Sequence, residues 1–485
     1  MIAAKFQVLL YSTRCPIFRR ISQFCKQLFE QPTATQDQVV NNDNGLDLQV
    51  IPRKSHNISR RQISENALKV LYRLHKSGFD AYLVGGGVRD ILLGLEPKDF
   101  DVVTNAKPEE IRKLFRNCRL VGRRFRLAHI VFGRDVIEVA TLRGHHKQTN
   151  DKISKSNAEG RLLRDNVYGT IDEDAERRDF TVNALYYDIS DFSIHSYGGG
   201  IQDIEQGAIR MIGDPETRYR EDPVRMIRAV RFATKLDMKI APETAAPIKT
   251  LAPLLGDIPA ARMFEEVSKL FFNGKAVQNY HLLYDFGLFQ PLFPQVVRGM
   301  DDESDPTLRK MVELIFRNTD RRIEQGKTVT PAYFYAAILW YPLQQKALDI
   351  MTEGGLSHYD AFVAAMGDVM EQQCRSIGIP RRFSTVSKEI WQLQLRLEKN
   401  QGTRAFKLIE HPKFRAAYDL LLMRGEVESG KVNQLAKWWR SFVDASDEER
   451  TDIARQANKA NNRNRNGSKR RRRAPRKPRN EQQNG

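Results

Sequence analysis

Hydrophobic residues first recur at helical spacing between residues 63 and 74. They stand at Ile63, Ala67, Val70, Leu71 and Leu74. Positions three and four apart share one face of a helix, so this stretch predicts an amphipathic helix with one buried face. The pattern stops before Gly78, and glycine is common just after the last turn of a helix. We therefore expect the helix to end there.

Short apolar runs separated by turn residues follow, and they are typical of strands. The predicted strands cover residues 81–84, 99–103, 127–132 and 136–142. Three glycines at 85–87 lie between the first strand and a helical pattern. A further helix begins near Pro108, with Thr104 or Asn105 as its expected N-cap. The pattern predicts a head of mixed α and β structure.

From about Met211 onward, helical patterns dominate. The clearest cover residues 223–236, 261–272, 388–397 and 414–423. Residues 31–57 are polar and show no periodicity, so they predict a linker. The first 29 residues hold five basic side chains and no acid, a pattern shared by transit peptides and surface-binding amphipathic segments. We interpret them as a disordered leader.

These patterns divide the chain into five segments. We expect a basic leader and polar linker (1–57), a mixed α/β head (58–210), a helical neck (211–275), a helical body (276–450) and a disordered basic tail (451–485). The hydrophobic share of 41% is enough to bury a core in most of the chain, which excludes disorder throughout.

Charge points to a polyanionic partner. The net charge is +18, and +10 of it lies in residues 456–485, which hold eleven Lys or Arg residues and one acid. Such a segment is too charged to fold alone, and its cations replace counterions along a phosphate backbone. We expect it to bind nucleic acid, RNA included, through residues that include Arg470, Arg471, Arg472 and Arg473, and an anionic membrane surface is another candidate partner. The alternative is a solubilising appendage.

Cysteine spacing and hydropathy exclude other classes of protein. The four cysteines lie far apart and form no C-x-x-C pair, so neither a disulfide scaffold nor a cysteine zinc site is indicated. The longest apolar stretch, 331–343, is shorter than the ~20 residues that cross a bilayer. We expect a cytoplasmic protein without a transmembrane segment, with peripheral contact to a membrane as an option that the basic leader leaves open.

Asp99 and Asp101 are the first candidates for chemistry. They lie two residues apart in a predicted strand, so both carboxylates leave the same face. Two Mg²⁺ ions held ~3.5–4 Å apart need shared, hard oxygen ligands. The pair suits such a site, although Asp-x-Asp alone is a weak signal and solvated strand-end acids are the simpler interpretation.

The neighbouring residues strengthen the metal interpretation. Gly85 and Gly86 lie between a strand and a helix, where bare N–H groups and the positive helix end bind phosphates. Arg89 is one turn into that helix. Glu138 adds a third carboxylate in a strand expected beside the Asp-bearing one, and an edge-strand acid facing water is the alternative. The dinucleotide-binding and P-loop glycine patterns are not met.

The segment VGGGVRDILLGLEPKDFDVVT, residues 84–104, resembles the signature of the DNA polymerase beta type of nucleotidyltransferases. The branch in question holds the bacterial poly(A) polymerases and the CCA-adding enzymes. The resemblance implies a polymerase-beta-like head followed by an all-α neck and body. It implies that Asp99 and Asp101 are catalytic and ligate two Mg²⁺ ions with Glu138, and that Gly85, Gly86 and Arg89 hold the triphosphate of ATP.

Two further motifs match this branch. ERRDFTVNALYYD resembles its R-R-D-x-x-x-N element, which implies a catalytic or ribose-positioning Asp179 and nucleotide contacts from Arg177, Arg178 and Asn183. If this segment is helical, Asp179 and Asn183 lie one turn apart on one face. The alternative is that Asp179 only caps a helix.

EDPVRMIRAVRF resembles the E-D-x-x-R element, which selects the incoming base without a template. Asp222 and Arg225 supply one acceptor and one donor for adenine. Asp222 before Pro223 is also a good N-cap. A cation in the first turn opposes the helix macrodipole, so we expect an acceptor near Arg225. Arg228 continues the same edge, as a phosphate contact or a solvated residue.

The strand segment RLVGRRFRLAHIVF, residues 119–132, resembles the hallmark of the bacterial poly(A) polymerases rather than the CCA-adding enzymes. Arg123, Arg124 and Arg126 are expected to contact phosphates of RNA or ATP, and pairing with acidic neighbours is the alternative. His129 is interpreted as structural, because no second histidine lies at ligand spacing.

The resemblance implies a template-independent poly(A) polymerase that adds AMP from ATP to RNA 3′ ends and, by analogy, promotes RNA decay with RNA-decay proteins as partners. A CCA-adding enzyme acting on tRNA is the rival within the branch. An inactive RNA-binding adaptor is the rival from another class, and the intact carboxylate set disfavours it.

Overall fold

The computed structural model describes residues 46–122, 126–144, 167–300, 305–400 and 403–457, together with the backbone of 39–40. The predicted RNA-binding residues Arg123, Arg124, Arg470, Arg471, Arg472 and Arg473 lie outside these ranges. The chain forms two compact units, the first from Met1–Arg225 with Lys235–Leu251 and the second from Met226–Thr234 with Ala252–Gly485. Each is described by itself below.

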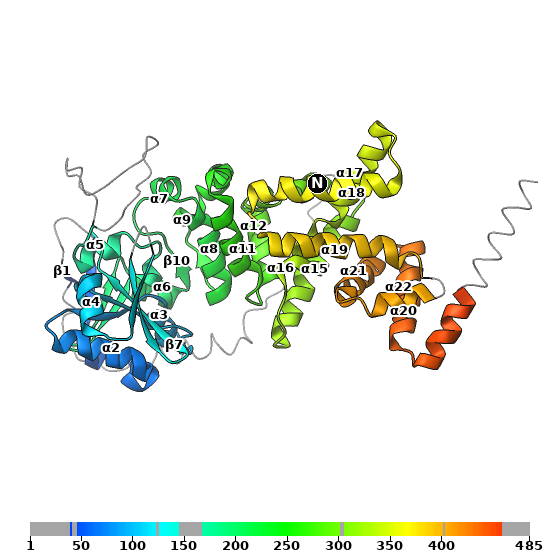
Figure 1. Ribbon diagram of the computed structural model, residues 1–485. Helices are drawn as coiled ribbons and strands as arrows, with labels where there is room; N and C mark the ends of the chain where they lie inside the picture. The colour runs from blue at the N-terminus through cyan, green and yellow to red at the C-terminus, as the bar shows by residue number, and fades with distance from the viewer. Residues whose placement is uncertain are drawn as a thin grey trace, which may run out of the picture. The chain divides into compact units, whose positions relative to one another are not determined.

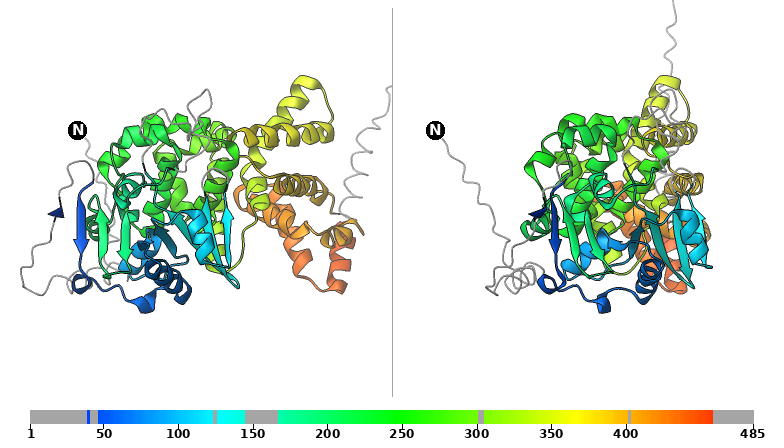
Figure 2. Two further views of the ribbon diagram at one scale, coloured as in Figure 1. Left: turned by 60° about the vertical axis from the view of Figure 1, so that its left-hand side comes forward. Right: turned by 90° about the vertical axis from the view of Figure 1, so that its left-hand side faces the viewer.

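The first unit is built on a nine-stranded sheet, counted over the described residues, in the order β1-β2-β9-β8-β3-β4-β7-β6-β5. Its strands are β1 (Val39–Val40), β2 (Leu48–Ile51), β3 (Ala81–Val84), β4 (Asp101–Thr104), β5 (Cys118–Val121), β6 (Leu127–Phe132), β7 (Asp135–Thr141), β8 (Leu185–Asp188) and β9 (Ile194–Tyr197). β4 and β7 pair in parallel, and the other neighbours pair antiparallel. The strands run side by side from blue β2 to cyan β5 in Figure 2.

The helices of this unit cover the sheet and extend past it. They are α2 (Glu65–Lys76), α3 (Gly86–Leu92), α4 (Pro108–Leu114), α5 (Ile171–Glu176), α6 (Gly200–Gln206), α7 (Pro215–Glu221), α9 (Pro242–Ala245) and α10 (Ile248–Leu251), with 3-10 turns η1 (Arg53–Ser55), η2 (Arg60–Gln62) and η3 (Thr181–Asn183). A two-stranded parallel sheet joins β10 (Ala208–Ile209) to β11 (Lys239–Ile240). Helix α8 (Val224–Leu236) contributes residues to both units.

Alternation along the strands separates two faces of the sheet. Leu83, Val102 and Val139 are buried on the face against which α2 packs. The opposite face carries Val84 and Val103, which belong to a buried cluster with Ala175 of α5 and Tyr186 of β8. Because the side-chain period is two residues, a slip of one residue in β4 would exchange these faces.

The described residues of the second unit form helices. They are η4 (Ala252–Asp257), α11 (Ala260–Phe271), α12 (Ala276–Asp285), α13 (Phe289–Leu292), α14 (Pro294–Met300), α15 (Thr307–Glu324), α16 (Pro331–Ile338), α17 (Trp340–Gly354), α18 (His358–Ser376), α19 (Arg381–Leu397), α20 (Thr403–Ile409), α21 (Phe414–Val427) and α22 (Lys431–Asp444). Aromatic rings fill the core, as where Phe271 and Phe316 lie with ring centroids 4.6 Å apart. Helices α17 and α18 pair as a hairpin, drawn yellow in Figure 1.

The predicted elements are confirmed in most of the head and body, with five corrections. Asp99 precedes β4 and is not in a strand. β2 lies in the segment predicted to be a linker, because pairing with β9 stabilises a short strand that has no signal of its own. Lys107, not Thr104 or Asn105, is the N-cap of α4, since the Glu110 carboxylate accepts from its backbone N–H. β11 interrupts the predicted all-helical neck.

The fifth correction concerns the tail. The charge pattern predicts a disordered tail from residue 451, but residues 451–457 are helical.

Among the helices in the described ranges, none is both long and apolar enough to cross a membrane.

Candidate active site

Three carboxylates lie close together where β4 begins. Asp101 is the first residue of β4 and pairs with Val84 of β3. In the parallel pair β4–β7, Val102 lies opposite Val139, so Asp101 and Glu138, each one residue earlier, project from the same face. Asp99 lies in the loop just before the strand. The expectation that the strand of Glu138 lies beside that of Asp101 is confirmed.

The surroundings of Asp101 change the pKa of its carboxyl group. Desolvation by burial is the main cause that raises the pKa of Asp101 to about 6, and repulsion from Glu138 and Asp99 adds to it. Arg178 acts in the opposite direction. Across the next strand pair, the His129 ring lies 3.5 Å from the Glu138 carboxylate, in agreement with a structural role for this histidine. The site therefore holds excess negative charge that a cation would relieve.

The oxygen donors of these side chains are of the hard type that Mg²⁺ prefers. Within the ranges that the structure covers, no three His, Cys, Asp or Glu side chains converge as a ready-made metal-binding group. The donor chemistry and the mutual repulsion fit a divalent cation, and the ligand set Asp99, Asp101 and Glu138 stays a prediction.

The glycine turn lies beside these acids. Gly85 has φ +66° and is the N-cap of α3, so it takes a backbone conformation that a side chain would strain. A Cβ atom at this position would stand 3.3 Å from Nη1 of Arg178. The Gly85 N–H donates to the carbonyl of Leu185 at 2.9 Å. The sharp turn thus brings bare backbone close to a guanidinium.

Arg178 is held by a buried network on the same face. Its Nε donates to the Tyr186 hydroxyl at 2.7 Å and its Nη2 to the Asp174 carboxylate at 3.0 Å. Tyr186 also donates to Asp174, at 2.8 Å. Burial alone would lower the pKa of Arg178, but Tyr186 and Asp174 outweigh it and raise the pKa. A fixed cation therefore stands beside the glycine turn and is close enough to Asp101 to act on its pKa.

Arg89 differs from the expectation of an open phosphate ligand. Only 2% of the residue is exposed. Its guanidinium donates to Asp90 at 2.9 Å and to the side-chain oxygen of Asn183. Asp90 also lies 3.6 Å from the Lys235 ammonium. In this conformation the Arg89 guanidinium orients the Asn183 side chain. Direct contact of Arg89 with a triphosphate stays a prediction.

The R-R-D segment is a turn rather than a helix. Helix α5 ends at Glu176, and the 3-10 turn η3 begins at Thr181. Asp179 and Asn183 nevertheless meet, since the Asn183 amide donates to Asp179 at 3.2 Å. The Asp179 carboxylate also accepts from the Phe180 N–H, so it does not cap η3, whose N-cap is Phe180.

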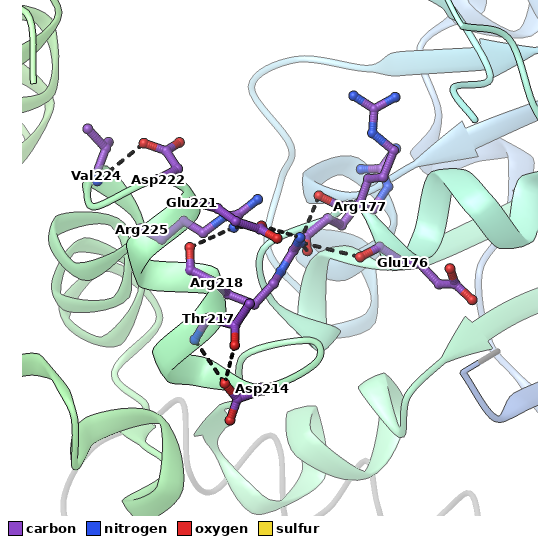
Figure 3. Close-up of polar contacts among 10 residues, drawn as sticks. Glu176, Arg177, Asp214, Thr217, Arg218, Glu221, Asp222, Val224 and Arg225 are labelled. Atoms are coloured by element: carbon purple, nitrogen blue, oxygen red, sulfur yellow. Dashed lines mark hydrogen bonds and ion pairs between the residues drawn. The ribbon is translucent and has the colours of Figure 1, made fainter. Parts of the chain in front are cut away.

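Figure 3 shows the E-D-x-x-R segment at the junction of α7 and α8. The Asp222 carboxylate accepts from the Val224 N–H at 3.3 Å, which agrees with the N-cap alternative. Arg225 donates to the Glu221 carboxylate at 2.8 Å and to the Arg218 carbonyl at 2.7 Å. The expectation of an acceptor near Arg225 is confirmed, and the acceptors belong to the chain itself.

The other predicted cations lie as follows. Arg177 donates to the Gly144 carbonyl at 3.0 Å. Arg126 donates to Glu109 at 2.7 Å, in agreement with the acidic-neighbour alternative, and both side chains remain exposed. Arg228 belongs to the second unit, where its guanidinium lies 5.4 Å from the Phe232 ring centroid.

Sequence reasoning missed several residues that support the site: Asp90, Asp174, Tyr186, Arg218 and Glu221. Asp174 and Arg178 stand four apart, but their partnership depends on the hydroxyl of a strand residue further along the chain. The spacings of Arg218 with Glu221 and of Asp174 with Arg178, three and four residues, were readable signals for ion pairs.

Comparison with known families matches three parts of the chain. The Poly A polymerase head domain model matches residues 81–210. The model described as the probable RNA and SrmB-binding site of polymerase A matches residues 237–300. The model of the polymerase A arginine-rich C-terminus matches residues 354–478.

Known proteins give the same result. A poly(A) polymerase I of Salmonella typhimurium is 53% identical over 91% of this chain and 95% of its own length. A CC-adding tRNA nucleotidyltransferase of Halalkalibacterium halodurans is 36% identical over 48% of this chain and 55% of its own length. The crystal structure of the Bacillus stearothermophilus CCA-adding enzyme with CTP is 26% identical, with a TM-score of 0.51 over 77% of this chain and 80% of that one.

The Gly85 turn predicts a matched pair of substitutions. Gly94 has φ +68°, and a Cβ atom there would meet no atom within 4 Å in the described part of the chain, whereas at Gly85 the Cβ crowds Arg178. Gly94→Ala should lower the melting temperature by about 2–4 °C through backbone strain alone. Gly85→Ala should add a loss of nucleotide transfer of about tenfold or more, because Arg178 must move. Equal transfer rates in the two variants would contradict the role given to this contact.

The raised pKa of Asp101 predicts a pH-dependent gain of stability on neutralisation. Above pH 6 the native carboxylate is charged and repelled, so without metal Asp101→Asn should be more stable than wild type, by about 1 kcal/mol or less because the exposed charges are screened. Below about pH 4 the carboxyl is protonated in both the native and the unfolded chain and the gain should vanish. Thermal melts in EDTA from pH 4 to 8 measure this.

Glu96→Gln is the control for that series, since it neutralises an exposed acid in the loop that precedes β4. A gain in Asp101→Asn that does not depend on pH would show that repulsion at this carboxyl is not its cause.

Proposed function

Because this chain belongs to the poly(A) polymerase I family, we propose how its residues carry out the family's reaction. The chain is a template-independent polynucleotide adenylyltransferase, which adds AMP from ATP to RNA 3′ ends. The observation that carries the assignment of residues is the position of Asp101 beside Glu138 on the sheet face and next to the Gly85 turn, where burial and repulsion from Glu138 and Asp99 raise its pKa.

Asp99, Asp101 and Glu138 would hold two Mg²⁺ ions, the count expected of an in-line phosphoryl displacement. When bound, the metal supplies activation of the RNA 3′ hydroxyl and neutralisation of the departing pyrophosphate. Asp101 keeps a raised pKa although Arg178 acts to lower it, so the arginine does not offset the burial of this carboxylate and its repulsion by Glu138 and Asp99. The attacking hydroxyl then displaces pyrophosphate from the α-phosphorus of ATP, and no covalent enzyme intermediate is needed.

ATP would lie along the turns that surround the acids. The backbone at Gly85 and Gly86 and the start of α3 face the triphosphate, with Arg178 as a fixed cation beside it. Asp179 and Asn183, joined by their hydrogen bond, would position the ribose. Asp222 and Arg225 would read adenine as acceptor and donor. Arg89 would also position Asn183, to which it donates a hydrogen bond, and its contact with the triphosphate stays a prediction.

RNA would be held mainly by charge. Residues 456–485 and the basic segment around Arg126 supply cations without sequence preference. A role on tRNA is the second candidate within the branch, and the shorter match to a tRNA nucleotidyltransferase disfavours it. Contacts with RNA-decay proteins or with the inner membrane stay predictions from the sequence.

A transfer assay tests the carboxylate assignment. Purified protein and Mg²⁺ receive an oligoadenylate primer or a tRNA lacking its last nucleotides, with one labelled nucleoside triphosphate at a time. We expect long ladders with ATP on the generic primer. Asp99→Ala and Asp101→Ala should lower transfer by at least about a thousandfold while leaving RNA binding nearly intact.

Glu96→Gln serves again as the matched control and should transfer normally. Addition that stops after three nucleotides and includes CTP would select the tRNA enzyme. Full activity in either Ala variant would remove that aspartate from the proposed site.

Removal of residues 456–485 tests the tail. With eleven cations lost, the slope of log Kd for RNA against log salt should flatten by several units, since each phosphate contact contributes roughly 0.7–0.9. Turnover at saturating primer should change little. An unchanged salt slope in filter binding between about 50 and 200 mM salt would assign the tail to another partner.

A further inference from the structure

We propose that Arg218 is a positioning residue that sets the enzyme's preference for adenine. It joins the turn that carries Asp179 to the segment that carries Asp222 and Arg225. This inference rests on the proposed function, because it takes Asp222 and Arg225 as the base-reading pair.

Arg218, which belongs to α7, caps the C-terminal end of α5 with its guanidinium group. Its Nη2 lies 3.3, 3.0 and 2.7 Å from the carbonyl oxygens of Glu176, Arg177 and Arg178. The last carbonyls of a helix have no partner within it, and an arginine can satisfy them. Here the cap lies on the residues that lead into Asp179, so it fixes where the R-R-D turn begins.

The other side of the same guanidinium holds the base-reading segment. Its Nη1 donates to the Glu221 carboxylate at 2.9 Å, and Arg225 donates to the same oxygen, Oε2, at 2.8 Å. Arg225 also donates to the Arg218 carbonyl. Figure 3 shows Arg218 between the end of α5 on one side and Glu221 with Arg225 on the other. One carboxylate oxygen thus links two arginines side by side.

Two largely buried arginines that lie side by side repel each other. Several contacts together must therefore hold Arg218 and Arg225 in this geometry. Only 14% of each arginine side chain is exposed. Burial and then repulsion by Arg225 lower the pKa of Arg218, and Glu221 opposes both. Nε of Arg218 is buried with no hydrogen-bond partner in the described part of the chain. A flexible surface arginine would turn this donor to water.

A planar guanidinium can make these contacts together, and an ammonium cannot. Lysine at position 218 would keep the charge and reach either the carbonyls or Glu221. The segment that carries Asp222 and Arg225 would then shift relative to Asp179. Recognition of a base by one acceptor and one donor depends on such distances, so the loss should fall on discrimination between bases.

The matched control lies on the same helix. Arg220 is also in α7 and pairs with Glu216 at 2.7 Å, but both side chains are more than half exposed. Arg220→Lys changes the same residue type two positions away without touching either turn.

The test measures kcat/KM for single-nucleotide addition with ATP, CTP and GTP, alongside melting temperature. For Arg218→Lys we expect the ratio of ATP to CTP to fall by about tenfold or more, with the larger change in KM for ATP. Arg220→Lys should keep the wild-type ratio. Glu221→Gln leaves the hydrogen bonds from Arg218 to the α5 carbonyls in place and should also lower the ratio of ATP to CTP. If Arg218→Lys does not fold, the result for Glu221→Gln tests the inference.

Two outcomes would overturn the inference: an unchanged ratio, or equal losses with all three nucleotides, which is what a purely structural role produces. Asp222→Asn separates this failure from failure of the proposed function. If Asp222→Asn loses adenine preference and Arg218→Lys keeps it, only the role of Arg218 is wrong. If Asp222→Asn keeps the preference, the base-reading assignment itself is wrong.

Discussion

The site depends on one electrostatic constraint: three negatively charged carboxylates interact where β4 begins. The parallel pairing of β4 with β7 places Asp101 beside Glu138, and the loop before β4 brings Asp99 to them. A fold normally separates such groups or pairs each with a cation. Here the Arg178 guanidinium donates to Asp174 and Tyr186 instead, and Asp101 keeps a raised pKa.

Arginines in this unit act mainly as connectors between backbone segments. Arg178 links α5 to β8, Arg89 links α3 to the turn before β8, and Arg218 links α7 to the end of α5. Each is largely buried, and each contacts a carbonyl or a side-chain oxygen of another element. Since guanidinium groups present donors in a rigid plane, these links restrain direction as well as distance. The turns around residues 85, 179 and 183 are thereby held by contacts within the chain.

The sequence predicted what depends on local pattern and missed what depends on distant partners. Strand 81–84, the strand of Glu138 and the glycine turn follow from apolar runs and from residues with special backbone freedom. β2 was missed because its pairing with β9 forms only after folding. The burial of Arg89 was missed because it requires Asn183, which is close only in the folded chain. A motif identifies residue types, while burial decides which of them face a ligand.

The strand order has a consequence for synthesis on the ribosome. β3 pairs on one side with β4, which follows it closely in the chain, and on the other side with β8, which comes much later. β2 pairs with β9, which also comes much later in the chain. Until residues 185–197 have emerged, the nascent head presents unpaired strand edges that can join those of a neighbouring chain. The head can therefore complete its sheet only after these residues have emerged, and its exposed strand edges favour aggregation during that interval.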